Sequence, residues 1–166
     1  MKRAWCSLLM GVLWLTVFPV EQSLGQFFFM EADLTGKPAP DFTLNTTLKD
    51  KVNFIQYRNQ LPAIVFFWAT WCPHCREQLK ELNTKRELFA ADQVKLAVID
   101  LAESKKQVEK YLKKNNIELE VFLDEEGEVE TKYQLMGVPT FYFVNKEGTV
   151  TAVRHSLPED YQTLLK

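Results

Sequence analysis

The sequence predicts a mixed α/β domain in which one sheet carries helices on both of its faces. Three features indicate this fold class: two unbroken apolar runs typical of buried strands, an amphipathic helical pattern after each of them, and a hairpin near the end. Strand–helix–strand units favour parallel pairing, and the late hairpin adds an antiparallel edge. The 166 residues, 46% of them hydrophobic and 25% charged, suit one domain with a substantial core.

The first expected elements are two short strands. Gly36 to Pro40 is rich in turn-forming residues and leads into a short apolar alternation through Phe42 and Leu44. We expect Val52 to Ile55 to form a second short strand beside it.

The central strand is expected at Ala63 to Ala69, an unbroken run of apolar residues rich in β-branched and aromatic side chains. Pro62 and the Thr70-Trp71 turn bound it, so it is typical of a strand buried on both faces. From Pro73 to about Phe89, apolar residues recur among charges at helical spacing and predict an amphipathic helix.

A second strand–helix unit follows. Val94 to Ile99 predicts another buried strand that ends at Asp100, and Ser104 to Asn115 a helix that Ser104 caps. Val108, Tyr111 and Leu112 form its apolar stripe. The other face carries five lysines, which we interpret as a solvated helix face and not as a binding patch: Lys105, Lys106, Lys110, Lys113 and Lys114.

The remaining elements are short. We expect an extended segment at Leu119 to Leu123 and a helix at Val129 to Leu135. Thr140 to Val144 and Thr149 to Arg154 flank a turn that ends in glycine, which predicts a hairpin. Pro158 is expected to open a final helix that contains Tyr161, Leu164 and Leu165.

The N-terminus has the three-part pattern of a secretory signal. Lys2 and Arg3 precede an apolar run from Ala4 to Val20, and small residues follow at Ser23 and Gly25. We expect residues 1–25 to be a signal peptide that is cleaved after Gly25, or an uncleaved membrane anchor, and residues 36–166 to be the folded domain. The domain is then exported, and we expect it in the periplasm, either soluble or held by the N-terminal segment.

The charge balance excludes one class of partner. The chain has 20 basic and 22 acidic residues, a formal net charge of −2, and a pI of about 5.8. Nucleic-acid-binding domains usually carry a strongly basic face, so we expect no nucleic-acid partner.

Three cysteines are too few for a disulfide-stapled scaffold or a four-cysteine zinc site. Cys6 falls in the expected signal segment, whereas Cys72 and Cys75 lie three residues apart. A disulfide that closes so short a loop removes little entropy from the unfolded chain, so the pair makes better sense as chemistry.

The spacing and placement of this pair predict a redox centre. Trp71-Cys72-Pro73-His74-Cys75 falls where the first long strand turns into its helix, and a helix N-terminus stabilises a thiolate. We expect Cys72 to attack and Cys75 to resolve the mixed disulfide, with the thiol pKa of Cys72 lowered from about 8.5 to roughly 3.5–7.5. His74 would stabilise the thiolate further and make the couple more oxidising.

Two alternatives for the cysteines stay open at this point. The pair can be an inert structural disulfide. It can also be a metal site in which Cys72, Cys75 and the distant His155 are ligands, although no second cysteine pair is available.

Gly137-Val138-Pro139-Thr140 precedes the strand at residues 140–144 and is the second candidate element. The proline can be a tolerated residue at a strand start. We favour a cis peptide between Val138 and Pro139 that faces the cysteines, where the backbone of Val138 pairs with an extended substrate peptide.

Three stretches resemble the exported TlpA/ResA-type thiol–disulfide oxidoreductases of the thioredoxin superfamily, which are AhpC/TSA-redoxin-like. They are the redox motif at residues 68–75 together with residues 137–140, the opening at residues 36–44, and the closing hairpin at residues 143–148. Ala97 to Leu123 resembles the insertion that sets this family apart from minimal thioredoxin. The resemblance spans about residues 36–155. It implies a thioredoxin fold with short N-terminal strands and a central insertion, a redox-active Cys72/Cys75 pair and a cis Pro139.

The resemblance also implies a function. Members of this type act as reductants of protein cysteines, often those of apocytochrome c during cytochrome c maturation, and exchange electrons with a membrane thiol protein. We expect no cofactor beyond the cysteine pair and no metal.

Two departures from the family pattern bear on the direction of the reaction. Gln78, beside Glu77, stands where many members carry a glutamate that tunes the thiols, and Pro73-His74 is similar to the dipeptide of DsbA-type oxidases. We therefore expect Trp71, Pro73, His74 and Gln78 to tune the couple. The alternatives to the reductant are a DsbA-like disulfide donor and a copper- or zinc-binding metallochaperone.

Overall fold

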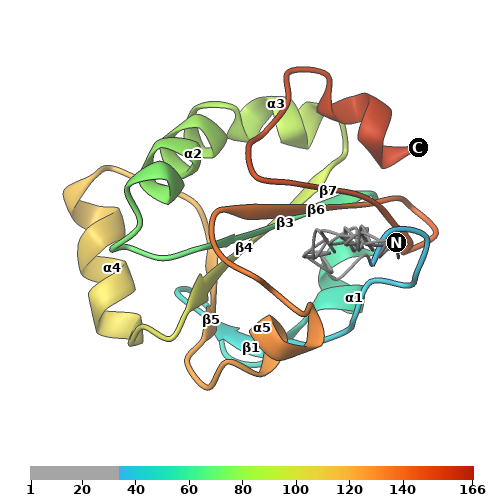
Figure 1. Cartoon of the computed structure of the whole chain (residues 1–166). Coiled ribbons are helices and arrows are strands. Elements are labelled where there is room, and N and C mark those ends of the chain that lie inside the picture. The colour runs from blue at the N-terminus through green and yellow to red at the C-terminus, as the bar shows by residue number, and fades with distance from the viewer. Residues whose placement is uncertain (1–33) are drawn as a thin grey trace, which may run out of the picture.

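A seven-stranded mixed sheet with the strand order β2-β1-β5-β4-β3-β6-β7 forms the centre of the structure (Figure 1). The structure, a computed structural model, describes residues 34–166. The expected signal segment, its cleavage site and Cys6 lie outside the described residues.

The elements follow one another along the chain in this order: β1 (Thr43–Thr46), β2 (Val52–Asn53), α1 (Phe54–Arg58), β3 (Ala63–Trp68), α2 (Pro73–Thr84), α3 (Arg86–Ala91), β4 (Lys95–Leu101), α4 (Lys105–Lys114), β5 (Val121–Asp124), α5 (Glu128–Lys132), β6 (Thr140–Val144), β7 (Val150–Arg154) and a final 3₁₀ turn, η1 (Tyr161–Leu165).

Strand β3 is central, as its apolar sequence predicts, and all six of its residues are buried. It pairs in parallel with β4 and antiparallel with β6, while β5 pairs in parallel with β4. The register sets Trp68 beside Asp100, so the carboxyl ends of β3 and β4 meet at one edge of the sheet. That edge leads directly into α2.

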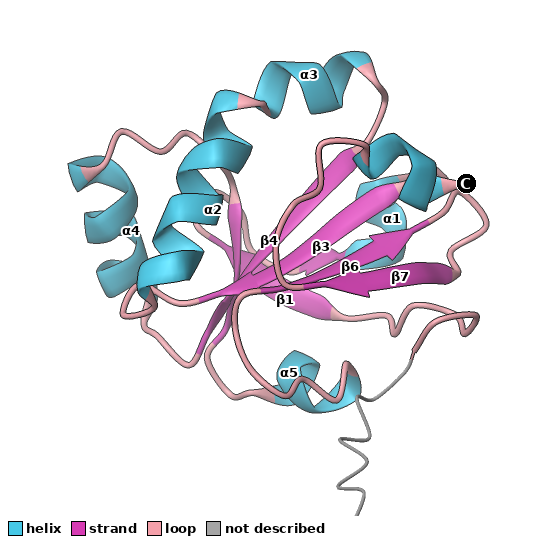
Figure 2. Ribbon diagram, turned by 45° about the horizontal axis from the view of Figure 1, so that its top comes forward, coloured by secondary structure: helices cyan, strands magenta, loops and turns pink. Residues whose placement is uncertain are grey.

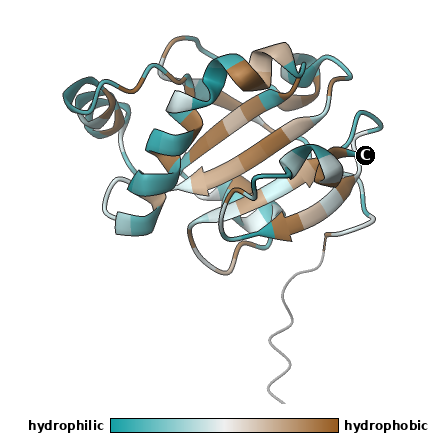
Figure 3. Cartoon of the chain, turned by 90° about the horizontal axis from the view of Figure 1, so that it is seen from above, coloured by the Kyte–Doolittle hydropathy of each residue, from teal (hydrophilic) through white to brown (hydrophobic). Residues whose placement is uncertain are grey.

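Helices cover both faces of the sheet, which confirms the predicted α/β class (Figure 2). Side chains alternate along β3 because successive residues of a strand point to opposite faces. Ile64, Phe66 and Trp68 pack with residues of α2, α3, α4 and η1, and Val65 and Phe67 pack with residues of α1 and α5. In Figure 3 the strands carry most of the hydrophobic colour and the helices carry hydrophilic residues on their outer surfaces.

The second predicted strand is wrong in its latter half. Only Val52 and Asn53 pair with β1, and the chain turns into α1 at Phe54. The Asn53 side chain accepts a hydrogen bond from the backbone N–H of Gln56 at 3.0 Å, and this N-cap starts the helix where a strand is predicted.

Three predicted helices also differ in their bounds, one of them being α5, which ends at Lys132 and not at Leu135. The helix expected at Pro73 to about Phe89 is interrupted at Lys85, which separates α2 from α3. Pro158 does not open the last helix, because η1 begins at Tyr161 after Asp160 and is a 3₁₀ turn. Only the last three residues of the expected segment at residues 119–123 belong to β5, which runs on to Asp124.

Among the described residues, no helix combines the length and the apolar character needed to cross a membrane.

Candidate active site

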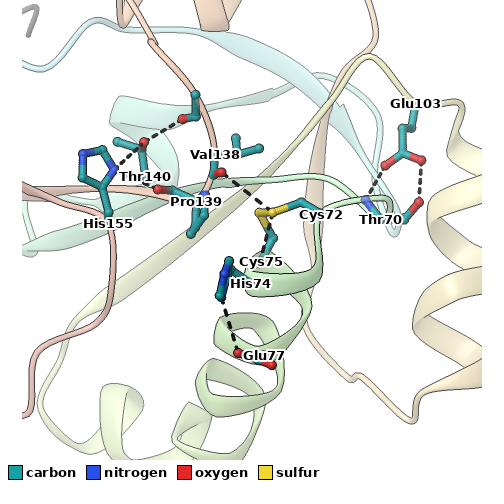
Figure 4. The surroundings of a disulfide bond; sticks show 11 residues. Thr70, Cys72, His74, Cys75, Glu77, Glu103, Val138, Pro139, Thr140 and His155 are labelled. Atoms are coloured by element: carbon teal, nitrogen blue, oxygen red, sulfur yellow. Dashed lines mark hydrogen bonds and ion pairs between the residues drawn. A yellow bond between two sulfur atoms is a disulfide. The ribbon is translucent and has the colours of Figure 1, made fainter. Parts of the chain in front are cut away.

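Cys72 and Cys75 form a disulfide at the junction of β3 and α2 (Figure 4). Cys72 is the N-cap of α2, and its Sγ accepts a hydrogen bond from the backbone N–H of Cys75 at 3.2 Å. Pro73 occupies the first turn, where its missing N–H costs no helical hydrogen bond. The positive end of the helix therefore points at the Cys72 sulfur, which favours a negative charge there.

The two cysteines differ in their exposure to solvent. Cys75 is fully buried, whereas Cys72 keeps 6% of its surface exposed. Trp71 on one side of Cys72 is 67% exposed, and Pro73 on the other side is exposed as well. A protein substrate can thus reach Cys72, and Cys75 can reach only the sulfur of Cys72.

The loop before β6 lies against Cys72. The Val138–Pro139 peptide is cis, as the sequence predicts, and the Val138 carbonyl oxygen lies 3.8 Å from Cys72 Sγ. Val138 and Pro139 are both partly exposed, so the backbone of the loop is available beside the disulfide.

Two side chains hold this loop. The Thr140 hydroxyl donates to the Gly137 carbonyl at 2.7 Å, and His155 Nδ1 lies 3.0 Å from the Pro139 carbonyl oxygen. Because a carbonyl oxygen only accepts, the Nδ1 of His155 must carry the hydrogen of this bond. His155 on the segment after β7 thereby fixes the loop from the side away from the disulfide (Figure 4).

His74 and Gln78 have other partners than the sulfurs. His74 Nδ1 lies 3.7 Å from Glu77 Oε2, and both side chains are largely exposed. Gln78 Oε1 accepts a hydrogen bond from the backbone N–H of Leu157 at 2.7 Å, while its Nε2 lies 3.4 Å from Glu81. Gln78 therefore joins α2 to the segment that follows β7.

Glu103 is a residue that the sequence reasoning missed. It is 8% exposed and accepts two hydrogen bonds from Thr70, one from the backbone N–H at 2.5 Å and one from the hydroxyl at 2.6 Å. Its place just after β4 is a usable signal, because the carboxyl ends of parallel neighbours such as β3 and β4 meet at the same edge of a sheet.

Asp100 is a second buried carboxyl group at this edge. It has no exposed surface and lies close to the Glu103 side chain, and Trp68 Nε1 beside it has no hydrogen-bond partner within the part of the chain that the structure describes. Burial, followed by the nearby negative charge of Glu103, raises the pKa of Asp100 from its usual 3.8 to about 9. Asp100 is therefore protonated at neutral pH.

In the metal alternative Cys72 and Cys75 are ligands, but the structure joins these two cysteines in a disulfide. Between residues 34 and 166, no group of three or more His, Cys, Asp and Glu side chains is placed to hold a metal ion. His155, the third ligand in that alternative, is hydrogen-bonded to the Pro139 carbonyl.

Residues 35–153 match the AhpC/TSA family. The sporulation thiol-disulfide oxidoreductase A of Bacillus subtilis is 30% identical over 91 residues, which are 53% of this chain and 55% of that protein. This chain thus spans about half the length of that relative. The thiol-disulfide oxidoreductase ResA of Bacillus subtilis is 26% identical over 136 residues, covering 79% of this chain and 75% of ResA.

Solved structures share the fold. The crystal structure of StoA from Bacillus subtilis aligns with a TM-score of 0.64 and 22% identity, covering 76% of this chain and 95% of that one. A thiol:disulfide interchange protein of the thioredoxin family from Chlorobium tepidum aligns with a TM-score of 0.65 and 24% identity, covering 77% and 92%. The sheet and its flanking helices are those of the thioredoxin fold.

Proposed function

Since the chain belongs to the AhpC/TSA family and is a thiol–disulfide oxidoreductase, we propose that it is exported and reduces disulfides in proteins, including the haem-binding cysteines of apocytochrome c. The observation that carries this proposal is the position of Cys72. Cys72 caps α2 and keeps 6% of its surface exposed, and its sulfur lies 3.8 Å from the carbonyl oxygen of Val138.

The reaction begins with the reduced form of the protein. The Cys72 thiolate attacks one sulfur of the substrate disulfide, a Cys72–substrate disulfide forms, and the other substrate sulfur leaves as a thiolate that takes up a proton. The Cys75 sulfur then attacks Cys72 Sγ and releases the second substrate thiol. Two electrons pass to the substrate, and the Cys72–Cys75 disulfide seen here is the oxidised product.

Local geometry supports each step. The N–H of Cys75 and the N-terminus of the twelve-residue α2 stabilise negative charge on the Cys72 sulfur, which favours the thiolate that attacks the substrate. Cys75 lies one turn further along α2 and is fully buried. The sulfur that it can attack is therefore Cys72 Sγ in the mixed disulfide.

The loop at Val138 and Pro139 supports a role in holding the substrate. An extended peptide whose cysteine reaches Cys72 passes the partly exposed backbone of Val138, and main-chain hydrogen bonds of the strand-addition type would hold it there. Such bonds depend little on side chains and suit an enzyme that acts on several proteins. Regeneration then requires a second thiol partner, for which we propose a membrane-bound dithiol protein, with no cofactor beyond the cysteine pair.

A disulfide donor is the second candidate, because Pro73-His74 is similar to the dipeptide of DsbA-type oxidases and Gln78 supplies no negative charge beside the thiols. The substrate is tested by trapping, and the direction by the redox potential of the Cys72/Cys75 couple. A Cys75→Ala variant stalls at the mixed disulfide, so its covalent partners in the native compartment can be identified, with a Cys72→Ser variant as the matched control. Recovery of apocytochrome c with the first variant alone supports the proposal. Equal recovery of partners with both variants contradicts it.

A further inference from the structure

A groove of about 430 Å³ lies between α2 and α4 and includes Thr70 and Pro73 of the turn that carries the disulfide. The two helices stand next to each other on the same face of the sheet (Figures 1 and 2). Residues of the redox turn, of α2 and of α4 line the groove, chiefly Thr70, Pro73, Arg76, Lys80, Tyr111 and Lys114.

The groove reaches the redox centre from the side opposite to the substrate loop. Thr70 and Pro73 flank the Trp71-Cys72 pair, so the lining begins one residue away from the reacting sulfur. In Figure 4, Val138 lies on one side of Cys72, and Thr70 with Glu103 lies on the other. A polypeptide that crosses Cys72 can therefore touch Val138 and this groove at the same time.

The charge in the groove is opposite to that of the whole chain. Arg76, Lys80 and Lys114 line it, whereas the chain carries a formal net charge of −2. Within residues 34–166 none of these three cations forms an ion pair, although other cations of the fold do, such as Lys85 with Glu81 at 2.6 Å. The groove is thus lined by three cations that have no ion-pair partner among the described residues, against the single carboxylate of Glu77.

One carboxylate, that of Glu77, also lines the groove, and its Oε2 lies 3.7 Å from Nδ1 of His74. The remaining wall is the ring of Tyr111, which packs against Trp68 with ring centroids 5.6 Å apart. The groove therefore presents three cationic side chains around the ring of Tyr111. This combination is complementary to the carboxylate side chains of an acidic peptide.

We propose that this groove binds acidic residues of the partner protein that flank the cysteine attacked by Cys72. The proposal rests on the proposed function, since it names the kind of sequence that the same redox centre selects. It also revises the interpretation of the lysine-rich helix face: Lys114 belongs to a binding groove, while Lys105 is paired with Glu109 at 3.9 Å.

The test uses three synthetic peptides that contain one disulfide and differ only in the residues flanking it, which are Glu, Gln or Lys. The full-length protein is reduced with dithiothreitol, and the dithiothreitol is then removed. Single-turnover experiments with each peptide give a maximal rate and a half-saturation concentration. Two or three exposed charge pairs should lower the half-saturation concentration for the Glu peptide about tenfold relative to the Gln peptide. The difference should shrink when the ionic strength rises to about 0.5 M.

Two variants locate the effect. In the triple variant Arg76→Gln, Lys80→Gln and Lys114→Gln, the preference for the Glu peptide over the Gln peptide should disappear. The matched control replaces three exposed lysines elsewhere, Lys37, Lys51 and Lys132, by Gln. It changes the net charge equally and should keep the preference.

The outcomes separate this proposal from the one on which it rests. If the protein reduces none of the peptides, the proposed function fails. If it reduces all three with equal half-saturation concentrations, prefers the Lys peptide, or keeps its preference in the triple variant, the groove proposal is wrong and the reductase function stands. If the triple variant has the same thermal unfolding temperature as the parent protein, its fold is intact.

Discussion

The carboxylate of Glu103 receives both polar hydrogens of Thr70, the backbone N–H at 2.5 Å and the hydroxyl at 2.6 Å. Thr70 lies two residues before Cys72, and Glu103 lies between β4 and α4. This pair of bonds therefore ties the redox turn to the neighbouring strand and helix. Because Glu103 is 8% exposed, water competes little for its oxygens, and the position of the turn depends on them.

Replacement of Glu103 by Gln should loosen this turn. A carboxamide offers one acceptor oxygen, so one of the two Thr70 hydrogens loses its partner, at a cost of about 1–3 kcal/mol in the free energy of unfolding. Urea unfolding measures this loss. Glu126→Gln, at an exposed position, is the control and should cost nothing measurable. Equal stability of the two variants would show that the Thr70–Glu103 bonds are unimportant.

The buried Asp100 predicts a pH dependence of stability. The folded chain keeps the Asp100 proton up to a pKa of about 9, whereas the unfolded chain releases it near its usual value of 3.8. Between these values the unfolded state binds fewer protons, so this contribution to the free energy of unfolding falls as pH rises, by at most about 4 kcal/mol between pH 4 and 7. Below pH 4 both states are protonated.

Asp100→Asn is neutral at every pH and should remove this slope. We expect the variant to gain stability relative to the parent as pH increases from 5 to 8 in urea unfolding experiments. Asp50→Asn changes an exposed carboxylate and serves as the control. A parent and an Asp100→Asn variant with parallel stability curves over this range would contradict the raised pKa.

Gln78 offers a test of how the couple is tuned. It lies three residues after Cys75 on α2, on the same helix face, and its Oε1 accepts from the N–H of Leu157. Gln78→Glu keeps an acceptor for Leu157 and adds a negative charge, which disfavours the thiolate more than the neutral disulfide. We expect the midpoint potential to fall by about 10–20 mV.

Equilibration with glutathione or dithiothreitol measures that shift. Lys132→Glu adds negative charge on α5, on the opposite face of the sheet, and should leave the potential unchanged. An unchanged or higher potential in Gln78→Glu would show that this position does not act on the sulfurs through its charge.

The central strand, the redox centre and the cis proline could be predicted from short stretches of the sequence. The apolar run of β3, the Cys72/Cys75 spacing before α2 and the proline at residue 139 each identify their structure within a few neighbouring residues. The start of α1 was not predicted. The sequence pattern at residues 52–55 is typical of a strand, but the Asn53 side chain caps a helix there.

The contacts between distant segments could not be predicted in this way. Glu103 meets Thr70 only because β3 and β4 pair in parallel, and Gln78 meets Leu157 across 79 residues. Lys114 joins Arg76 in one groove because α2 and α4 cover the same face of the sheet. Each of these depends on the tertiary fold, which no short window of sequence contains.

The midpoint redox potential of the Cys72/Cys75 couple tests the central claim most directly. It is measured on the full-length protein by equilibration with thiol–disulfide buffers, and the Cys72→Ser variant supplies the baseline. A reductant of protein disulfides should have a potential below roughly −250 mV. A value near −120 mV, in the range of strong disulfide donors, would contradict the proposed direction of electron flow.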